Sequence, residues 1–142
     1  MRIATTLLLL LFASLAPSCQ NANKTEVPKE VSAAFAVKYP DEMDPDFELD
    51  SHGYWEAHFK KKGEKYRADF NADGTWVETE NSIKDKEIPI AIQKAIHREF
   101  PEMKIAEAEH VMSAIKGEFY DIEFKQKGKN RDVEYREDGS KL

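Results

Sequence analysis

The sequence lacks the features that mark several large classes of protein. Its 142 residues include one cysteine, so no disulfide can form within the chain and a disulfide-stapled scaffold is excluded. Basic residues are not in excess: 21 Lys and Arg face 27 Asp and Glu, and a net charge of −6 argues against a nucleic-acid-binding protein. Long apolar runs are missing too, since the uncharged residues 3–16 are too short to span a bilayer comfortably. With 41% hydrophobic and 34% charged residues, a single globular unit remains.

The first residues are typical of a targeting signal. Met1 and Arg2 form a short positive segment ahead of the apolar residues 3–16. The segment Leu15-Ala16-Pro17-Ser18-Cys19 resembles a bacterial lipobox, which implies a signal peptide over residues 1–18, a lipid on Cys19 and a tether over residues 19–26. Pro17 and the position of Leu15 depart from the tightest pattern, so ordinary cleavage stays open. We expect a protein of the bacterial envelope, located in the periplasm and anchored in the outer membrane as a lipoprotein.

The remaining sequence contains an internal repetition. Val27-Pro28 returns as Ile88-Pro89, and Tyr39-Pro40 returns as Phe100-Pro101. In each copy a helix is expected between the two prolines, because apolar residues recur there on one helical side and the second proline ends the helix. The sequence predicts one repeat over residues 27–80, a linker over 81–87 and a second repeat over 88–142. The expected fold class is α+β: a tandem repeat of a helix plus about four antiparallel strands, with the helices packed on one face of the sheet.

After each helix the apolar pattern changes to a period of two, which is typical of half-buried strands. Trp55, Ala57 and Phe59 form the apolar side of one such strand. Residues in the opposite phase are expected on the solvent-facing side of the sheet, and these are Tyr54, Glu56, His58, Arg67, Asp69, Phe119, Asp121 and Glu123.

The order of these motifs resembles a known family. The chain is similar to PepSY-like proteins, which are related by fold to the β-lactamase inhibitor protein. The similarity lies in four duplicated motifs: a Val-Pro helix start, a Tyr/Phe-Pro helix end, an aromatic strand and an Asp-Gly hairpin. The resemblance covers residues 27–142 and implies an extracytoplasmic binding or inhibitory module. We expect no enzymatic activity, because acidic residues on a sheet with 34% charged residues are usually solvated. No short motif in this chain indicates that it inhibits a β-lactamase.

One segment matches a metal-binding pattern. Asp69, Asn71, Asp73, Gly74 and Glu80 satisfy the D-x-N-x-D-G-x5-E pattern of a calcium loop. Strands are expected on both sides where that loop needs helices, so a hairpin turn is the preferred interpretation. A ligand-sensing or calcium-binding module that uses residues 69–80 is the alternative function.

The histidines do not suggest a metal site by their spacing. His52 and His58 would lie roughly 20 Å apart along a continuous strand, and no HExxH motif occurs. We therefore expect surface or partly packed histidines, no bound metal and no cofactor. The basic run Lys60-Lys61-Lys62 is expected to be a solubilising turn.

The sequence favours a lipid-anchored protein-binding module that acts as an inhibitor or regulator of an envelope enzyme. Its expected partner is another envelope or secreted protein, not nucleic acid. The candidate contact residues combine aromatic rings with charge, and they are Tyr54, His58, Arg67, Trp76 and Phe119.

Overall fold

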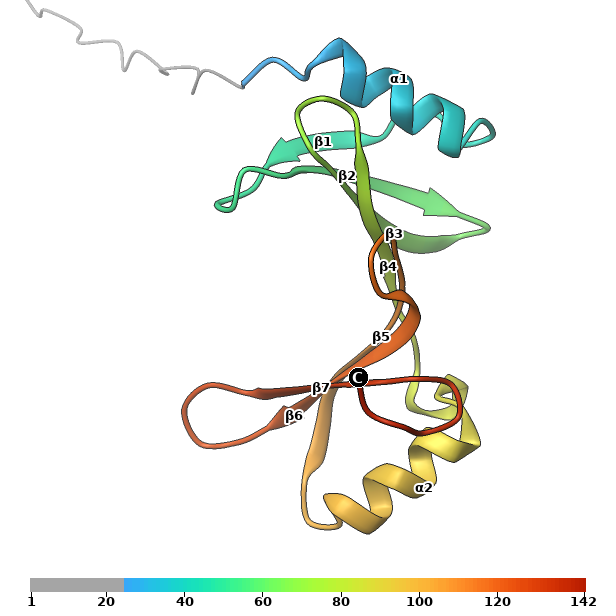
Figure 1. Ribbon diagram of the computed structural model, residues 1–142, viewed down its shortest axis with the longest axis vertical. Helices are drawn as coiled ribbons and strands as arrows, with labels where there is room; N and C mark the ends of the chain where they lie inside the picture. The colour runs from blue at the N-terminus through green and yellow to red at the C-terminus, as the bar shows by residue number, and fades with distance from the viewer. Residues whose placement is uncertain (1–24) are drawn as a thin grey trace, which may run out of the picture.

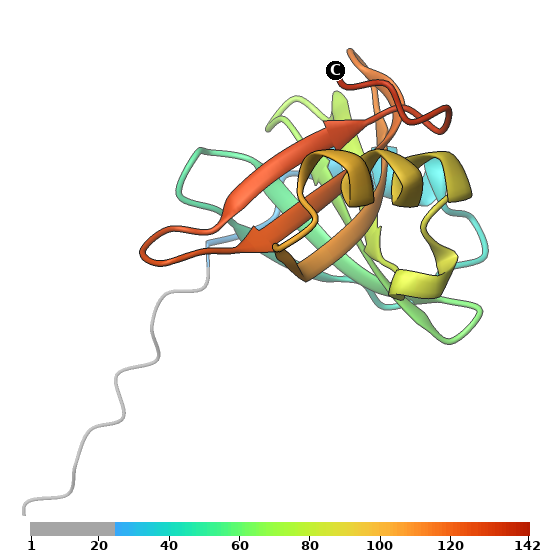
Figure 2. The same cartoon turned by 90° about the horizontal axis from the view of Figure 1, so that it is seen from below.

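The computed structural model describes residues 25–142, which form two α-helices and one β-sheet (Figures 1 and 2). The expected signal peptide, Cys19 and residues 19–24 of the expected tether lie outside the described residues. Among residues 25–142 no helix is both long and apolar enough to cross a membrane. The elements, in chain order, are α1 (Lys29–Lys38), β1 (Asp46–Leu49), β2 (Trp55–Lys61), β3 (Glu64–Phe70), β4 (Trp76–Ser82), the short 3₁₀ helix η1 (Asp85–Glu87), α2 (Ile90–Glu99), β5 (Lys104–Ser113), β6 (Gly117–Lys125) and β7 (Arg131–Tyr135).

The two helices begin and end where the prolines place them. Pro28 and Pro89 precede the first helical residues with φ of −58° and −51°, so their missing N–H groups cost no helical hydrogen bond. Tyr39 and Phe100 leave the helical conformation ahead of the next proline, and their N–H groups donate to Phe35 and Ile96 carbonyls. The predicted helices are therefore confirmed to within a residue at each end.

The predicted fold class is wrong, because the strands do not form a tandem repeat of a helix plus about four strands. All seven strands belong to one antiparallel sheet in the order β1-β2-β3-β4-β5-β6-β7. Only three strands follow α2, and near the C-terminus Lys141 makes a single isolated bridge with Tyr135. The predicted linker, residues 81–87, contains the end of β4 and η1. Since β4 pairs directly with β5 over Glu78–Ser82, neither half has a sheet of its own.

Two hydrophobic clusters lie on the same face of the sheet, one under each helix. Val31 and Phe35 of α1 pack with Trp55, Phe59 and Phe70, whereas α2 packs on a second cluster near the other end of the sheet. The second cluster contains Ile92, Ile96, Ile122, Phe124 and Tyr135. Figure 1 shows α1 and α2 at opposite ends of the molecule. Both helices therefore cover one sheet face, and the other face carries neither.

A hairpin turn contacts the first turn of α1 at Gly74. A Cβ atom built on Gly74 would lie 2.6 Å from the Glu30 carbonyl oxygen, and the φ of Gly74 is +84°. The replacement Gly74→Ala adds backbone strain to this clash, so we expect it to lower the free energy of unfolding by about 2 kcal/mol or more. Urea unfolding measures this loss. Gly63→Ala is the matched control, since Gly63 has a φ of +88° with nothing within 4 Å of the added Cβ. Equal losses at both sites would contradict a steric contribution from the helix.

Tyr135 has a buried hydroxyl group without a hydrogen-bond partner. The residue is fully buried in the α2 cluster, and its Oη atom has no partner within the part of the chain that the structure describes. Tyr135→Phe removes the desolvated hydroxyl and keeps the ring, so we expect stability to be unchanged or to rise by about 1 kcal/mol. Tyr39→Phe is the contrast, because the Tyr39 hydroxyl forms a hydrogen bond with Thr79 and its loss should destabilise the protein. A destabilised Tyr135→Phe variant would show that the hydroxyl has a partner in solution.

Candidate functional site

The sheet face opposite the helices is dominated by carboxylates, and we call it the acidic face. The antiparallel register aligns these residues in rows, such as Glu56, Asp69 and Glu78 across β2, β3 and β4. Each of the seven strands contributes to the face. Its acidic residues are Asp46, Glu48, Glu56, Asp69, Glu78, Glu80, Glu107, Glu109, Asp121, Glu123, Asp132 and Glu134.

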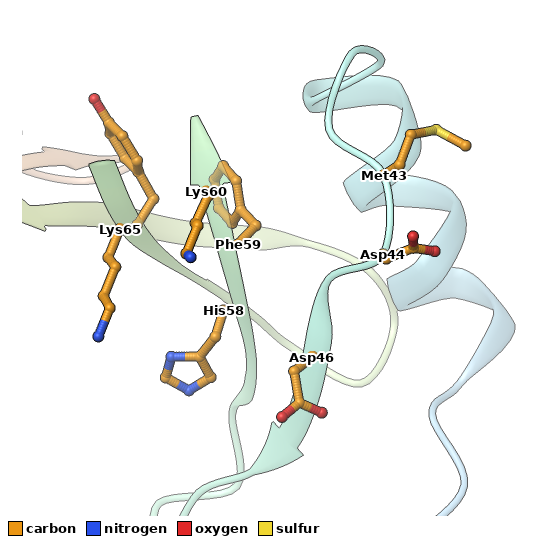
Figure 3. Close-up of a pocket in the computed structure, with 8 residues that line it drawn as sticks. Met43, Asp44, Asp46, His58, Phe59, Lys60 and Lys65 are labelled. Carbon is orange, nitrogen blue, oxygen red and sulfur yellow. The ribbon is translucent and has the colours of Figure 1, made fainter. Parts of the chain in front are cut away.

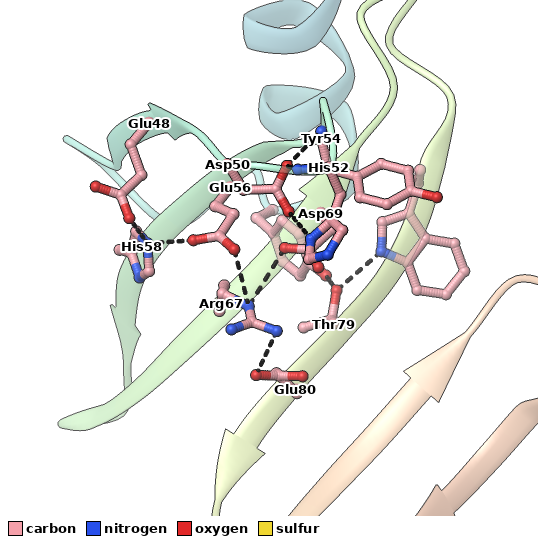
Figure 4. A network of polar contacts seen from close by, with 12 residues as sticks. Glu48, Asp50, His52, Tyr54, Glu56, His58, Arg67, Asp69, Thr79 and Glu80 are labelled. Carbon is pink, nitrogen blue, oxygen red and sulfur yellow. Dashed lines mark hydrogen bonds and ion pairs between the residues drawn. The ribbon is translucent and has the colours of Figure 1, made fainter.

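Arg67 lies among several of these carboxylates and pairs with three of them. Its Nη2 atom is 2.8 Å from Glu80 Oε1, and its Nε atom is 3.4 Å from Asp69 Oδ1 and 3.9 Å from Glu56 Oε1 (Figure 4). One guanidinium therefore serves three carboxylates, and the network retains a surplus of negative charge.

Burial and mutual repulsion raise the pKa of four carboxyl groups of this face. Burial raises the pKa of Asp69 to about 6, although Arg67 opposes the shift. Burial also raises the pKa of Asp121 to about 6, and the neighbouring Asp132 and Glu134 add to the effect. The pKa of Glu80 and the pKa of Glu109 are both raised, because the two carboxyl groups are partly buried and each lies among other acidic side chains. The face would thus gain from a cationic partner.

Two buried oxygens of the acidic face receive no hydrogen bond. Among residues 25–142, Asp69 Oδ1 and Asp121 Oδ1 are inaccessible to water and have no donor within bonding geometry. Asp69 Oδ1 has an ion-pair contact with Arg67 Nε, which itself donates no hydrogen bond. Buried acceptors without donors cost free energy, so these two carboxyl groups make the acidic face a less stable part of the fold.

The structure brings only part of the predicted contact set together. His58 is exposed on the acidic face and contacts Glu48 and Glu56, and Arg67 lies beside it on β3. Tyr54 is half-buried just before β2, where its N–H donates to Asp50 Oδ1.

Two of the predicted contact residues, both aromatic, do not lie exposed on the acidic face. Phe119 is on the acidic face but only 3% exposed, so the prediction that it faces solvent is wrong. It pairs with the buried Val111 across the strand, and Lys116 Nζ lies 5.2 Å from the ring centroid. Trp76 packs on the helix side against the α1 cluster, with Lys38 Nζ 3.4 Å from its ring centroid. Trp76 is therefore not available to the acidic face.

Sequence reasoning missed most carboxylates of the second half of the face. A signal was present, because acidic residues separated by one apolar or small residue occur on β4, β5, β6 and β7, for example Glu107-Ala108-Glu109. Since alternate residues of a strand point to one face, this spacing predicts a continuous acidic surface once the strands share a sheet.

The calcium-loop pattern corresponds to a hairpin turn. Asp73 Oδ1 accepts the Thr75 N–H, and the Asn71 N–H donates to the Thr75 carbonyl. Asp69 and Glu80 instead pair with Arg67 on the acidic face. Asp69 and Glu80 thus face Arg67 on the sheet, whereas Asp73 accepts a hydrogen bond within the turn.

A pocket of about 470 Å³ borders the acidic face at the β1–β3 end (Figure 3). Asp46 and His58 line it together with Lys60 and Lys65. The two lysines form a basic end to a face on which acidic residues predominate, and this polarity would orient a charged partner.

Residues 53–141 match the family model described as "Putative beta-lactamase-inhibitor-like, PepSY-like". This range spans more than half of the chain. The chain belongs to this PepSY-like family. No curated protein matches it.

Solved structures share the fold of this PepSY-like chain. A BLIP-like protein from Bacteroides fragilis superposes with a TM-score of 0.71 at 18% identity, covering 82% of this chain and 84% of that chain. A DUF2874 family protein from Bacteroides uniformis gives a TM-score of 0.73 at 18% identity, with 82% and 87% covered. A protein from Bacteroides eggerthii, described as a putative periplasmic protein, superposes with a TM-score of 0.69 at 22% identity. The match covers 82% of this chain and 86% of that chain. At these identities the likeness establishes the fold alone.

Proposed function

We propose that this protein is an extracytoplasmic protein-binding module without enzymatic activity, and that its acidic face docks on a basic surface of another envelope or secreted protein. The observation that carries the proposal is the continuous acidic face, whose carboxylates outnumber the cations paired with them. The family description and the BLIP-like neighbour support an inhibitory or regulatory role toward an envelope enzyme. The hairpin geometry of residues 69–80 does not favour the calcium-binding alternative.

The proposed location is the periplasm, with a lipid on Cys19 as the anchor to the outer membrane. It is supported by the lipobox-like segment and by the neighbour described as periplasmic. Cys19→Ala should release the protein from the membrane fraction, and the intact mass of the wild-type protein should include a bound diacylglycerol and acyl chain. A wild-type mass without lipid would refute the anchor and leave the docking proposal standing.

Affinity capture from envelope extract tests the docking proposal. The face variant is Glu109→Gln, Asp121→Asn and Glu123→Gln, which removes charge without removing volume. The changes at Glu109 and Asp121 relieve repulsion among partly buried carboxyls, so the variant should remain folded. The matched control is Glu26→Gln, Glu30→Gln and Glu102→Gln, three exposed acidic residues outside the face.

We expect wild type and control to capture the same partner and the face variant to lose it. Capture should also weaken as salt rises, because an electrostatic interface is screened. If the partner is an enzyme, its activity should fall in the complex. Equal capture by the face variant and the control would contradict the proposal.

A further inference from the structure

Two glutamates of the acidic face lie directly opposite each other on neighbouring strands. Glu48 of β1 pairs in register with Glu56 of β2, and like charges in this position repel. His58 follows Glu56 by two residues, so its ring lies on the same face. The antiparallel pairing therefore gathers two carboxylates and one imidazole at the β1–β2 edge of the acidic face (Figure 4).

The three side chains converge on one point. His58 Nε2 lies 3.2 Å from Glu56 Oε2 and 3.4 Å from Glu48 Oε1, and one ligand atom from each residue lies within 4.8 Å of the others. In a tetrahedral zinc site with bonds of about 2.0–2.2 Å, neighbouring ligand atoms are roughly 3.3–3.6 Å apart. Since Nε2 carries at most one proton, it cannot donate a well-aligned hydrogen bond to both oxygens. A cation placed between the three atoms would engage all of them.

We propose that Glu48, Glu56 and His58 bind a divalent transition-metal ion of the zinc type. The combination of imidazole nitrogen and carboxylate oxygen suits zinc, whereas calcium and magnesium prefer oxygen ligands alone. The side chains of Glu48 and His58 are 66% and 44% exposed, so the ion can enter from solvent. The fourth coordination position faces solvent and takes a water molecule.

Arg67 positions one of the ligands. Its Nε atom lies 3.9 Å from Glu56 Oε1, the oxygen that does not face His58, so Glu56 Oε2 stays directed toward the site. The guanidinium also pairs with Asp69 and Glu80, and the surplus of carboxylates around it leaves the surroundings attractive to a cation. The sequence predicted no metal site because the histidines are far apart along the chain. That spacing does not show that Glu48, on the neighbouring strand, lies beside His58.

Isothermal titration calorimetry and thermal unfolding of the purified, chelator-treated protein with zinc chloride test this site. We expect one zinc ion per chain and a rise in melting temperature of about 5 °C or more at a hundredfold excess over the dissociation constant. Magnesium at the same concentration should give no rise. Cobalt substitution should give visible absorption bands of low coordination number, which report the ligand geometry directly.

Three variants make the assignment specific. His58→Gln and Glu48→Gln should each reduce zinc affinity at least about tenfold, and both side chains are exposed enough for the fold to survive the change. His110→Gln is the matched control, because within residues 25–142 His110 Nε2 contacts one carboxylate, Glu118, at 2.7 Å. Absence of zinc binding, unchanged affinity in His58→Gln, or loss of affinity in His110→Gln would each overturn the proposal. These readouts need no partner protein, so they stand apart from the proposed docking function.

Discussion

Replacing Arg67 by methionine is expected to lower the free energy of unfolding at pH 8 by about 2 kcal/mol. Removing one member of a buried ion pair typically costs about 3–5 kcal/mol because it leaves the partner charges uncompensated, and partial exposure of Arg67 reduces that cost. The charges left behind are those of Glu56, Asp69 and Glu80. Urea unfolding at pH 8 measures the loss.

The controls separate lost charge from lost packing. Arg67→Lys keeps the positive charge and should lose less stability than Arg67→Met. Adding Glu80→Gln to Arg67→Met should restore part of the stability, because the added change removes one of the uncompensated carboxylates. If Arg67→Lys and Arg67→Met are equally destabilised, the account of Arg67 as the neutralising group of the face is wrong.

Acidification from pH 8 to about 5.5 is expected to stabilise the protein by roughly 2 kcal/mol through Asp69 and Asp121 together. The raised pKa values of Asp69 and Asp121, about 6 against an ordinary 3.8, mean that the folded state takes up protons in this range while the unfolded state does not. The raised pKa of Glu80 adds to the effect. The stabilisation from these groups is fully present below their ordinary pKa values, and it is lost as the pH rises through their raised pKa values in the folded protein.

Further acidification should reverse the trend. Thr75 N–H donates to Asp73 and lowers its pKa, and the Ser140 hydroxyl and N–H do the same for Asp138, so stability from these groups is lost when the pH falls through their lowered values. Melting temperature measured from pH 3 to pH 9 should therefore pass through a maximum in the mildly acidic range. Glu80→Gln should flatten the alkaline side of this curve, whereas Glu102→Gln, an exposed turn residue, should not. A stability that rises steadily from pH 5.5 to pH 8 would contradict the assigned shifts.

Local features of this fold could be predicted from the sequence because they depend on neighbouring residues. Pro28 and Pro89 start the helices, Tyr39 and Phe100 end them, and the alternation of Trp55, Ala57 and Phe59 places one strand side in the core. These signals act within a few residues and do not depend on how distant segments pair.

The pairing of β4 with β5 could not be predicted in this way. It joins segments separated by α2, and nothing within either strand specifies the neighbour. The same pairing decides which acidic residues become neighbours: Glu109 lies opposite Ser82, close enough to Glu80 to help raise the pKa of Glu80. For this reason the sequence predicted His58, Arg67 and the nearby Glu56 and Asp69 on one sheet face, but not the β4 and β5 carboxylates beside them.

Phe119 shows how burial can be misjudged from strand phase alone. Its alternation with Tyr120 and Ile122 correctly places it on the face away from α2, but exposure depends on what lies beside it. Val111 on β5 and Lys116 in the β5–β6 turn cover the ring. An aromatic residue on a face without helices can thus be buried by its own sheet neighbours.

Chemical labelling of carboxylates in the captured complex tests the docking account most directly. Carbodiimide-mediated labelling, read out by mass spectrometry, compares each Asp and Glu in the free protein and in the complex. The account predicts loss of labelling at Glu107, Glu123 and Asp132 of the acidic face, with Glu26, Glu30 and Glu102 labelled as before. Protection of the second group, with the acidic face labelled as in the free protein, would contradict it.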